Sequence, residues 1–253
     1  MALSKLSGDE QGIIFSQLCN VLEPRRAVYL SSTSKGLREP TQALLQQLRA
    51  DHKETAVLCR KVGLRSCKEL REAKEINWRN KGLSAADLGL LGSLGLVLPA
   101  LVSLIIIEAS GLDGVQRLAE GLGAGALPAV TNLGIIDVHV GDAGASALAA
   151  ALGQGALPLL KYLVLTDAGI SEAGLLALAP ALRRLPALER LYLAGNPFGD
   201  EGLAALVAPL PAGAPPLPAG VLTKLKRLNL SITQVTDAGC ATLVAALHRG
   251  ALP

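Results

Sequence analysis

His52, His139 and His248 are the histidines of this chain, and histidine is the side chain best suited to proton transfer at neutral pH. Histidine-dependent hydrolases pair it with a nucleophilic serine, as in the motif G-x-S-x-G, or use it to bind zinc, as in H-E-x-x-H. None of the three histidines lies in such a motif. We therefore expect no catalytic site and no enzymatic activity.

Glycines and cysteines offer two further kinds of chemistry. The segment Gly121-x-Gly123-x-Gly125 has the glycine spacing of a nucleotide-binding loop, but it lies in a Leu/Ala-rich stretch without a strand-loop-helix context or a following Gly-Lys-Ser/Thr. The cysteines lack the paired spacing of a zinc site. We therefore expect no cofactor, no metal ion and mostly buried, reduced thiols at Cys19, Cys59, Cys67 and Cys240.

The composition is dominated by aliphatic residues. Of 253 residues, 50% are hydrophobic but 2% are aromatic, and the mean hydropathy is +0.41. The 24 basic and 21 acidic residues are interspersed, so electrostatics predicts neither a nucleic-acid nor an anionic-lipid partner. The first ten residues include Asp9 and Glu10 and resemble neither a signal peptide nor a transit peptide, so we expect a cytoplasmic protein.

One segment, Leu88–Ile107, is uncharged over 20 residues and is therefore long enough to cross a bilayer. Pro99 and the glycines before it weaken a continuous helix. The same pattern also recurs downstream with charged residues inserted, so we predict no membrane span.

The recurring pattern is L-x-x-L-x-L, in six copies of which the first is the weakest. The copies start 28, 29, 30, 28 and 37 residues apart, at Ala73, Leu101, Val130, Leu160, Leu188 and Leu225. The later copies continue with a helix-capping residue such as Ser171 or Thr236, and then with Leu and Ala at three-to-four spacing. We predict a short strand and a helix in each unit, with a Pro-rich insertion near residues 210–220. First-turn acidic residues such as Asp200 and Glu201 would be favoured by the helix dipole.

These units resemble the ribonuclease-inhibitor-like class of leucine-rich repeat proteins over residues 71–253. The resemblance implies an α/β fold, a right-handed β-α horseshoe of about six repeats with a parallel sheet on its concave face. Stacked repeats share one aliphatic core, which explains the scarcity of aromatic residues. Leu88–Val97 then becomes the helix of one unit and Leu101–Ile107 the strand of the next. The family usually has an asparagine after each strand, and because only Asn196 fits, the other turns must satisfy their backbone groups differently.

Strand residues between the buried leucines would point to the concave face, where we expect a protein partner to bind. The central apolar residues of this face are Ile105, Ile107, Ile136 and Val164. An acidic row beside them comprises Glu108, Asp137 and Asp167. The aromatic and basic residues of the C-terminal half are Tyr162, Arg190, Tyr192 and Arg227. Adjacent exposed isoleucines favour a contact site, although an exposed sheet face can also carry arbitrary polar residues.

Residues 1–70 lack the repeat and are predicted to be helical, with one helix after Pro24 and another over Pro40–Leu48. One interpretation is a cap that covers the first repeat. The other is a resemblance to the F-box. It is carried by Leu6, Asp9, Ile14, Phe15, Leu18, Pro24, Ser31, Ser34 and Lys35, with Leu37 in place of a tryptophan. Ser7 replaces the usual proline, and Glu10 and Gln11 replace two apolar residues. That resemblance implies that Ile14, Phe15 and Leu18 dock a ubiquitin-ligase adaptor.

Together these features predict a non-enzymatic protein-protein interaction scaffold. The leading version is an F-box-like substrate adaptor of a cullin-type ubiquitin ligase. The alternatives are a structural subunit or assembly factor of a larger complex, and an inhibitor of the ribonuclease-inhibitor kind. The last residues, HRGALP, match the end of earlier units without a polar cap. We therefore expect the strand edge near Leu228–Leu230 to be covered by a partner, a second copy or further sequence.

Overall fold

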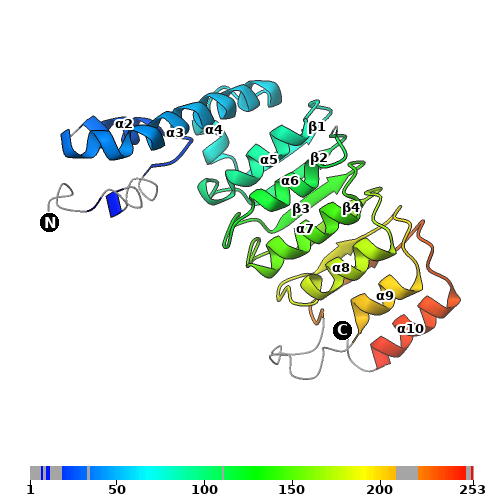
Figure 1. The fold of residues 1–253 in the computed structure, drawn as a ribbon. Coiled ribbons are helices and arrows are strands. Elements are labelled where there is room, and N and C mark those ends of the chain that lie inside the picture. Colours follow the sequence, from blue (N-terminus) through cyan, green and yellow to red (C-terminus); the bar gives the residue numbers. More distant parts are fainter. Residues whose placement is uncertain are drawn as a thin grey trace. The chain divides into compact units, whose positions relative to one another are not determined.

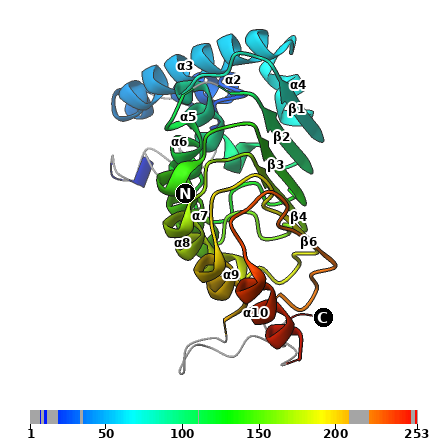
Figure 2. The same cartoon turned by 90° about the vertical axis from the view of Figure 1, so that its right-hand side faces the viewer.

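The computed structural model describes residues 7, 10–11, 19–32, 35–109, 111–208, 222–248 and 252, with the backbone alone for 35–40. The chain forms two compact units, Met1–Ala73 and Lys74–Pro253 (Figure 1, Figure 2). The Pro-rich insertion near 210–220 and the predicted docking residues Ile14, Phe15 and Leu18 lie outside the described residues.

The described helices of the first unit are α2 (Arg25–Ser32), α3 (Lys35–Val62) and α4 (Cys67–Glu72). Pro24 directly precedes α2, as predicted, because proline is pre-organised for a helix start. The helix predicted to end at Leu48 is longer, since α3 continues to Val62. The buried residues of this extension lie three to four positions apart, at Thr55, Leu58 and Val62. They therefore continue one packed face of the helix beyond the polar residues that follow Leu48.

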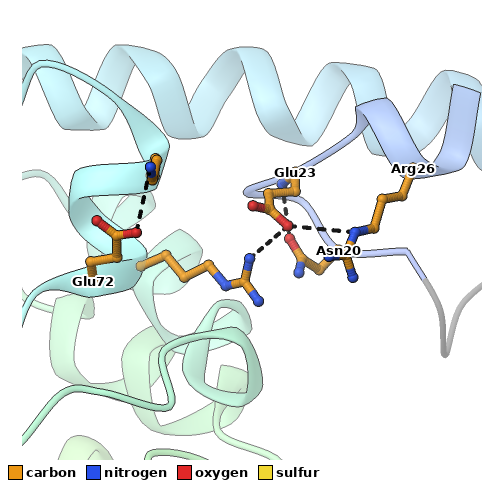
Figure 3. Close-up of polar contacts among 6 residues, drawn as sticks. Asn20, Glu23, Arg26 and Glu72 are labelled. Carbon is orange, nitrogen blue, oxygen red and sulfur yellow. Dashed lines mark hydrogen bonds and ion pairs between the residues drawn. The ribbon is translucent and has the colours of Figure 1, made fainter.

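A carboxylate links α2 and α4 within the first unit (Figure 3). Glu23, just before α2, forms an ion pair with Arg71 of α4, with 2.6 Å between Nη1 and Oε2, and Arg26 Nε lies 3.8 Å from the same oxygen. The backbone N–H of Glu23 donates to Asn20 Oδ1 at 2.9 Å. Because the Arg71 and Glu23 side chains are only about one third exposed (32% and 34%), solvent screens this pair less than a fully exposed one.

The second unit is a stack of strand–helix repeats. Its strands are β1 (Glu75–Arg79), β2 (Ser103–Ile107), β3 (Asn132–Ile136), β4 (Tyr162–Thr166), β5 (Arg190–Tyr192) and β6 (Arg227–Asn229). They form one parallel sheet in chain order. Along one side of the sheet lie α5 (Ala85–Ser93), α6 (Gly114–Gly121), α7 (Gly141–Gly153), α8 (Glu172–Leu182), α9 (Asp200–Val207) and α10 (Asp237–His248) (Figure 1, Figure 2). The predicted α/β architecture, a parallel sheet with a helix after each described strand, is confirmed.

The uncharged segment Leu88–Ile107 spans three of these elements. The helix α5 ends at Ser93, a 3-10 turn covers Gly95–Val97, and β2 begins at Ser103. Six of its leucines fill the core, each at most 1% exposed, at Leu88, Leu91, Leu94, Leu98, Leu101 and Leu104, whereas Leu96 is 63% exposed. No helix among the residues that the structure describes is long and apolar enough to span a membrane.

The core lies between the sheet and the helices. The leucines of the repeat motif are in register across neighbouring strands, so identical slots stack into one column. Leu104, Leu133, Leu163 and Leu191 in this column are at most 2% exposed. In the helix layer, Gly92 and Gly121 bring the backbones of α5 and α6 into direct contact, because a Cβ on Gly121 would lie 2.8 Å from Ser93 N.

Carboxylates near the helix starts connect successive repeats. Asp142 of α7 accepts from the N–H of Ser171 at 2.9 Å and from its hydroxyl at 2.6 Å, one repeat later. Asp200 of α9 accepts in the same way from Thr236, at 2.8 Å and 2.6 Å. Glu172 of α8 accepts from the N–H of Gly199 at 2.6 Å. Each carboxylate therefore caps the helix of the next repeat. From the sequence, only an interaction with the dipole of its own helix was expected for a first-turn carboxylate.

The turn after β4 shows how a repeat without asparagine satisfies its backbone. The Asn196 side chain accepts from the N–H of Ile170 in the preceding repeat at 3.0 Å. At the equivalent position, the carbonyl oxygen of Ala168 accepts from the N–H groups of Val140 and Gly141 at 2.8 Å and 3.0 Å. A main-chain carbonyl thus replaces the asparagine oxygen, as the need to pair buried N–H groups requires.

Asp142→Ala is expected to lower the free energy of unfolding by about 1 kcal/mol at neutral pH, the usual cost of losing a helix cap. Burial raises the pKa of Asp142, but the hydrogen bonds from Ser171 and Gly174 outweigh burial and the pKa is lowered overall. A lowered folded-state pKa stabilises the fold above the unfolded pKa of about 4, and this contribution is lost as the pH falls through the folded pKa. Urea unfolding between about pH 7 and pH 2 should show the wild-type advantage shrinking with acidity.

Glu201→Ala is the control for Asp142→Ala. Glu201 is an exposed first-turn carboxylate of α9, for which the described part of the chain shows no side-chain hydrogen bond. Its replacement should cost less than about 0.5 kcal/mol, as for most surface substitutions. An Asp142→Ala penalty that is independent of pH, or no larger than the control, would contradict the capping role.

Candidate functional site

The open face of the sheet is the side on which strand residues point away from the helices. Buried and more exposed residues alternate along β1, β2 and β4. Strand pairing aligns the open-face residues in rows across the repeats. One row is Asn77, Ile105, Gly134, Val164, Tyr192 and Asn229, and the next is Arg79, Ile107, Ile136 and Thr166.

The apolar patch consists of Ile105, Ile107, Ile136 and Val164, which lie on neighbouring strands and are half-buried. Gly134 sits among them. A Cβ built on Gly134 would lie 3.4 Å from Cγ1 and Cγ2 of Ile105, so the isoleucine covers this glycine. The structure thus brings these four sequence-predicted residues into one continuous aliphatic surface.

The Tyr/Arg cluster consists of Tyr162, Arg190, Tyr192 and Arg227, on β4, β5 and β6. The guanidinium carbon of Arg190 lies 4.9 Å from the centroid of the Tyr162 ring, within cation–π range. Arg227 Nη1 donates to the hydroxyl oxygen of Tyr192 at 3.4 Å. Val164 pairs in register with Tyr192, so the cluster adjoins the apolar patch.

The predicted acidic row has a conformational explanation. Glu108, Asp137 and Asp167 each follow a strand and have φ angles of 59°, 52° and 51°, in the left-handed region. Aspartate adopts this region more readily than most residues, so its presence in these turns does not require a partner. The carboxylate of Glu108 also lies 4.0 Å from Arg79, an exposed pair of small energetic weight. These residues border the open face and do not form part of its strands.

The described residues offer few groups for catalysis or metal binding. They contain no group of three or more His, Cys, Asp or Glu side chains that could hold a metal ion. Burial is the main cause that raises the pKa of Cys59 to about 12, and burial also raises the pKa of Cys67. Thiols held protonated in this way are poor nucleophiles.

The carboxylate caps between repeats were not anticipated from the sequence, although a signal for them exists. An acidic residue is followed two positions later by glycine in Asp142–Gly144, Glu172–Gly174, Asp200–Gly202 and Asp237–Gly239. The glycines make room, because a Cβ on Gly174 would collide with the carboxylate of Asp142 and one on Gly239 with that of Asp200. The short acid-x-Gly motif therefore marks contacts between repeats.

Comparison with known proteins found one family and one solved structure to which parts of the chain are similar. The model of the leucine-rich repeat family matches residues 185–207 and 221–244. Among solved structures, the chain is similar to an internalin of Listeria monocytogenes, at 16% identity over 61% of this chain and 48% of that chain, with a TM-score of 0.28. The match thus spans about half of the internalin chain. No curated protein matches the sequence. The matched segments include β5, α9 and β6 and therefore cover the C-terminal end of the described sheet, which strand pairing joins to the similar strand–helix units back to β1.

Proposed function

We propose that this chain is a non-enzymatic protein-recognition scaffold whose partner binds the open face of the sheet. The observation that carries the proposal is the apolar patch, with Ile107 and Ile136 in register on neighbouring strands. Side chains on this face lie outside the core between sheet and helices, so folding alone does not explain a continuous aliphatic surface there. An apolar surface bordered by charged residues is typical of a protein interface.

Ile107→Lys combined with Ile136→Lys tests the proposal. The lysine stems can lie along the sheet while the ammonium groups reach water, so the double variant should fold and melt cooperatively. In affinity purification of the tagged full chain from its native source, the partner recovered by wild type should fall by about tenfold or more. That loss corresponds to at least about 1.4 kcal/mol of binding free energy.

Leu176→Lys is the matched control for this experiment. Leu176 lies on α8 in the helix layer and is 42% exposed, so the control places a lysine at another partly exposed aliphatic position. It should recover the same partner as wild type. Full recovery of that partner by the Ile107/Ile136 variant would overturn the proposed binding face.

A more specific version is an F-box-like substrate adaptor of a cullin-type ubiquitin ligase, acting in the cytoplasm. It is supported by the sequence pattern of residues 6–37 and by the helical character of the described first unit, where Ser31 is buried and hydrogen-bonded to Thr41 at 3.1 Å. Replacing Ile14, Phe15 and Leu18 with alanine should abolish binding to the ligase adaptor while the melting temperature of the repeats is retained. Unchanged adaptor binding would contradict this version and would leave the open-face proposal intact.

A structural subunit or assembly factor is the alternative, supported by the surface of the last repeat. Ile232, Val244 and Leu247 are 85%, 50% and 45% exposed, and β6 is an edge strand. A partner, a second copy or further sequence covering this edge would bury them. Native purification should then yield a stable complex of fixed stoichiometry that contains no ligase component.

The repeats are also assigned here to the ribonuclease-inhibitor-like class. Support comes from the unit itself, because each described strand is followed by an α-helix and the first four strands start about 30 residues apart. Shorter classes replace the helix with irregular or 3-10 structure. An inhibitor function would further require tight one-to-one binding to an enzyme.

A further inference from the structure

Positive charge gathers where β4, β5 and β6 begin on the open face. Lys161, Arg190, Lys226 and Arg227 lie there with one carboxylate, Glu189. Lys226 Nζ donates to Glu189 Oε2 at 2.8 Å, and this hydrogen bond is the largest cause of the lowered pKa of Glu189. Glu189 is thus already engaged. Within the described ranges, neither Arg190 nor Arg227 has a carboxylate oxygen within 4.0 Å.

Arg190 and Arg227 occupy directly opposite positions on neighbouring parallel strands. Adjacent strands lie about 4.8 Å apart, and like charges at opposite positions repel each other. The tyrosines hold this arrangement, because Arg190 stacks on Tyr162 and Arg227 donates to the hydroxyl of Tyr192. Both arginines are exposed. The sheet therefore carries two exposed arginines at opposite positions of β5 and β6, an arrangement that repulsion between like charges disfavours.

We propose that the Tyr/Arg cluster is a subsite for an acidic segment of the partner protein, an inference that depends on the proposed function and specifies the chemistry of its partner. A carboxylate between Arg190 and Arg227 would replace their repulsion with charge-assisted hydrogen bonds. The rings of Tyr162 and Tyr192 add apolar contact, and tyrosine and arginine are the residue types that most often dominate interface energies.

The apolar patch indicates which side chains of the partner would flank that carboxylate. Val164 pairs with Tyr192 in register, so aliphatic surface begins next to the cluster. Beyond the patch lie the carboxylates of Asp137 and Asp167, which would repel a second acidic group. The partner segment therefore has an Asp or Glu beside aliphatic side chains, oriented with its acidic end over β5 and β6.

A library of random 12-residue peptides displayed on phage is the probe. It is selected against the immobilised full chain, against the double variant Arg190→Glu/Arg227→Glu, and against the control Lys81→Glu/Arg184→Glu, which makes the same change in net charge at two exposed residues outside the open-face strands. Wild type and control should enrich peptides with Asp or Glu beside aliphatic residues. The Arg190/Arg227 variant should bind those peptides at least about tenfold more weakly and enrich basic peptides instead. Binding to wild type should also weaken as salt concentration rises.

A stability measurement separates recognition from a structural role. Arg190→Ala and Arg227→Ala each remove one side of the repulsion, so the melting temperature should stay unchanged or rise while peptide affinity falls. A lowered melting temperature with unchanged affinity would overturn the subsite.

The remaining outcomes distinguish the subsite from the proposed function. Selected peptides without acidic bias, or acidic peptides that bind the Arg190/Arg227 variant as tightly as wild type, overturn the subsite. If such peptides still lose affinity for Ile107→Lys/Ile136→Lys, the open face remains the binding surface. If they bind that variant equally well, the proposed function fails too. If the selection enriches no peptide, the proposal that the Tyr/Arg cluster binds an extended acidic segment is wrong.

Discussion

Replacing Asn196 with alanine is expected to lower the free energy of unfolding by about 3 kcal/mol. Asn196 is 1% exposed, and its Oδ1 accepts from the N–H groups of Ala168 and Ile170 at 3.2 Å and 3.0 Å. Its Nδ2 donates to the carbonyls of Leu165 and Leu193 at 2.7 Å and 2.9 Å. Alanine leaves these groups of two successive repeats without their side-chain partner. Each buried polar group left unpaired costs about 1–3 kcal/mol.

Asn132→Ala is the control for the asparagine prediction. Asn132 is half-buried at the start of β3, and its side chain donates one described hydrogen bond, to Ser103 Oγ at 3.0 Å. Its loss should cost about 1 kcal/mol or less, because water can replace the bond. Chemical denaturation followed by circular dichroism measures both variants. If Asn196→Ala and Asn132→Ala lower the free energy of unfolding equally, the hydrogen bonds of Asn196 between repeats contribute no more than a surface hydrogen bond.

Gly121→Ala is expected to destabilise the repeats by about 2–3 kcal/mol, in the upper range for overpacking. Gly121 is the last residue of α6, and a Cβ there would lie 2.8 Å from both Gly92 C and Ser93 N of α5. These atoms belong to helix backbone and cannot rotate away as a side chain could. The two helices would have to separate, and the leucines beneath them would lose packing contacts.

Gly153→Ala is the control for the helix contact. Gly153 is also the last residue of its helix, α7, but a Cβ there would meet no atom within 4 Å. Alanine has the higher helix propensity, so this variant should be unchanged or up to about 1 kcal/mol more stable. Thermal unfolding of both variants measures the difference. If Gly121→Ala is as stable as Gly153→Ala, α5 and α6 can move apart without a loss of folding stability.

The sequence predicted the strand–helix unit and the strand register well, since six copies of one pattern leave little choice of alignment. It also singled out Asn196, the residue whose side chain bonds two repeats. It did not predict the carbonyl of Ala168 as the replacement for asparagine, because any residue type supplies a carbonyl oxygen. It placed the end of a helix at Leu48, because the polar residues after it hide the buried positions of α3 that follow.

The amino-acid order by itself determined the repeat architecture, the aliphatic core and which residues face away from the helices, because each of these follows from periodicity along one strand or helix. Only the tertiary structure decided which side chains of different repeats meet. Arg190 lies on Tyr162 and Asp142 caps Ser171 across separations of 28 and 29 residues. The strand register brings these residues to neighbouring positions, but the contacts also depend on side-chain conformations and on how closely the repeats pack, which the repeat period does not determine. The stacking of the repeats therefore decides which side chains of the open face contact one another.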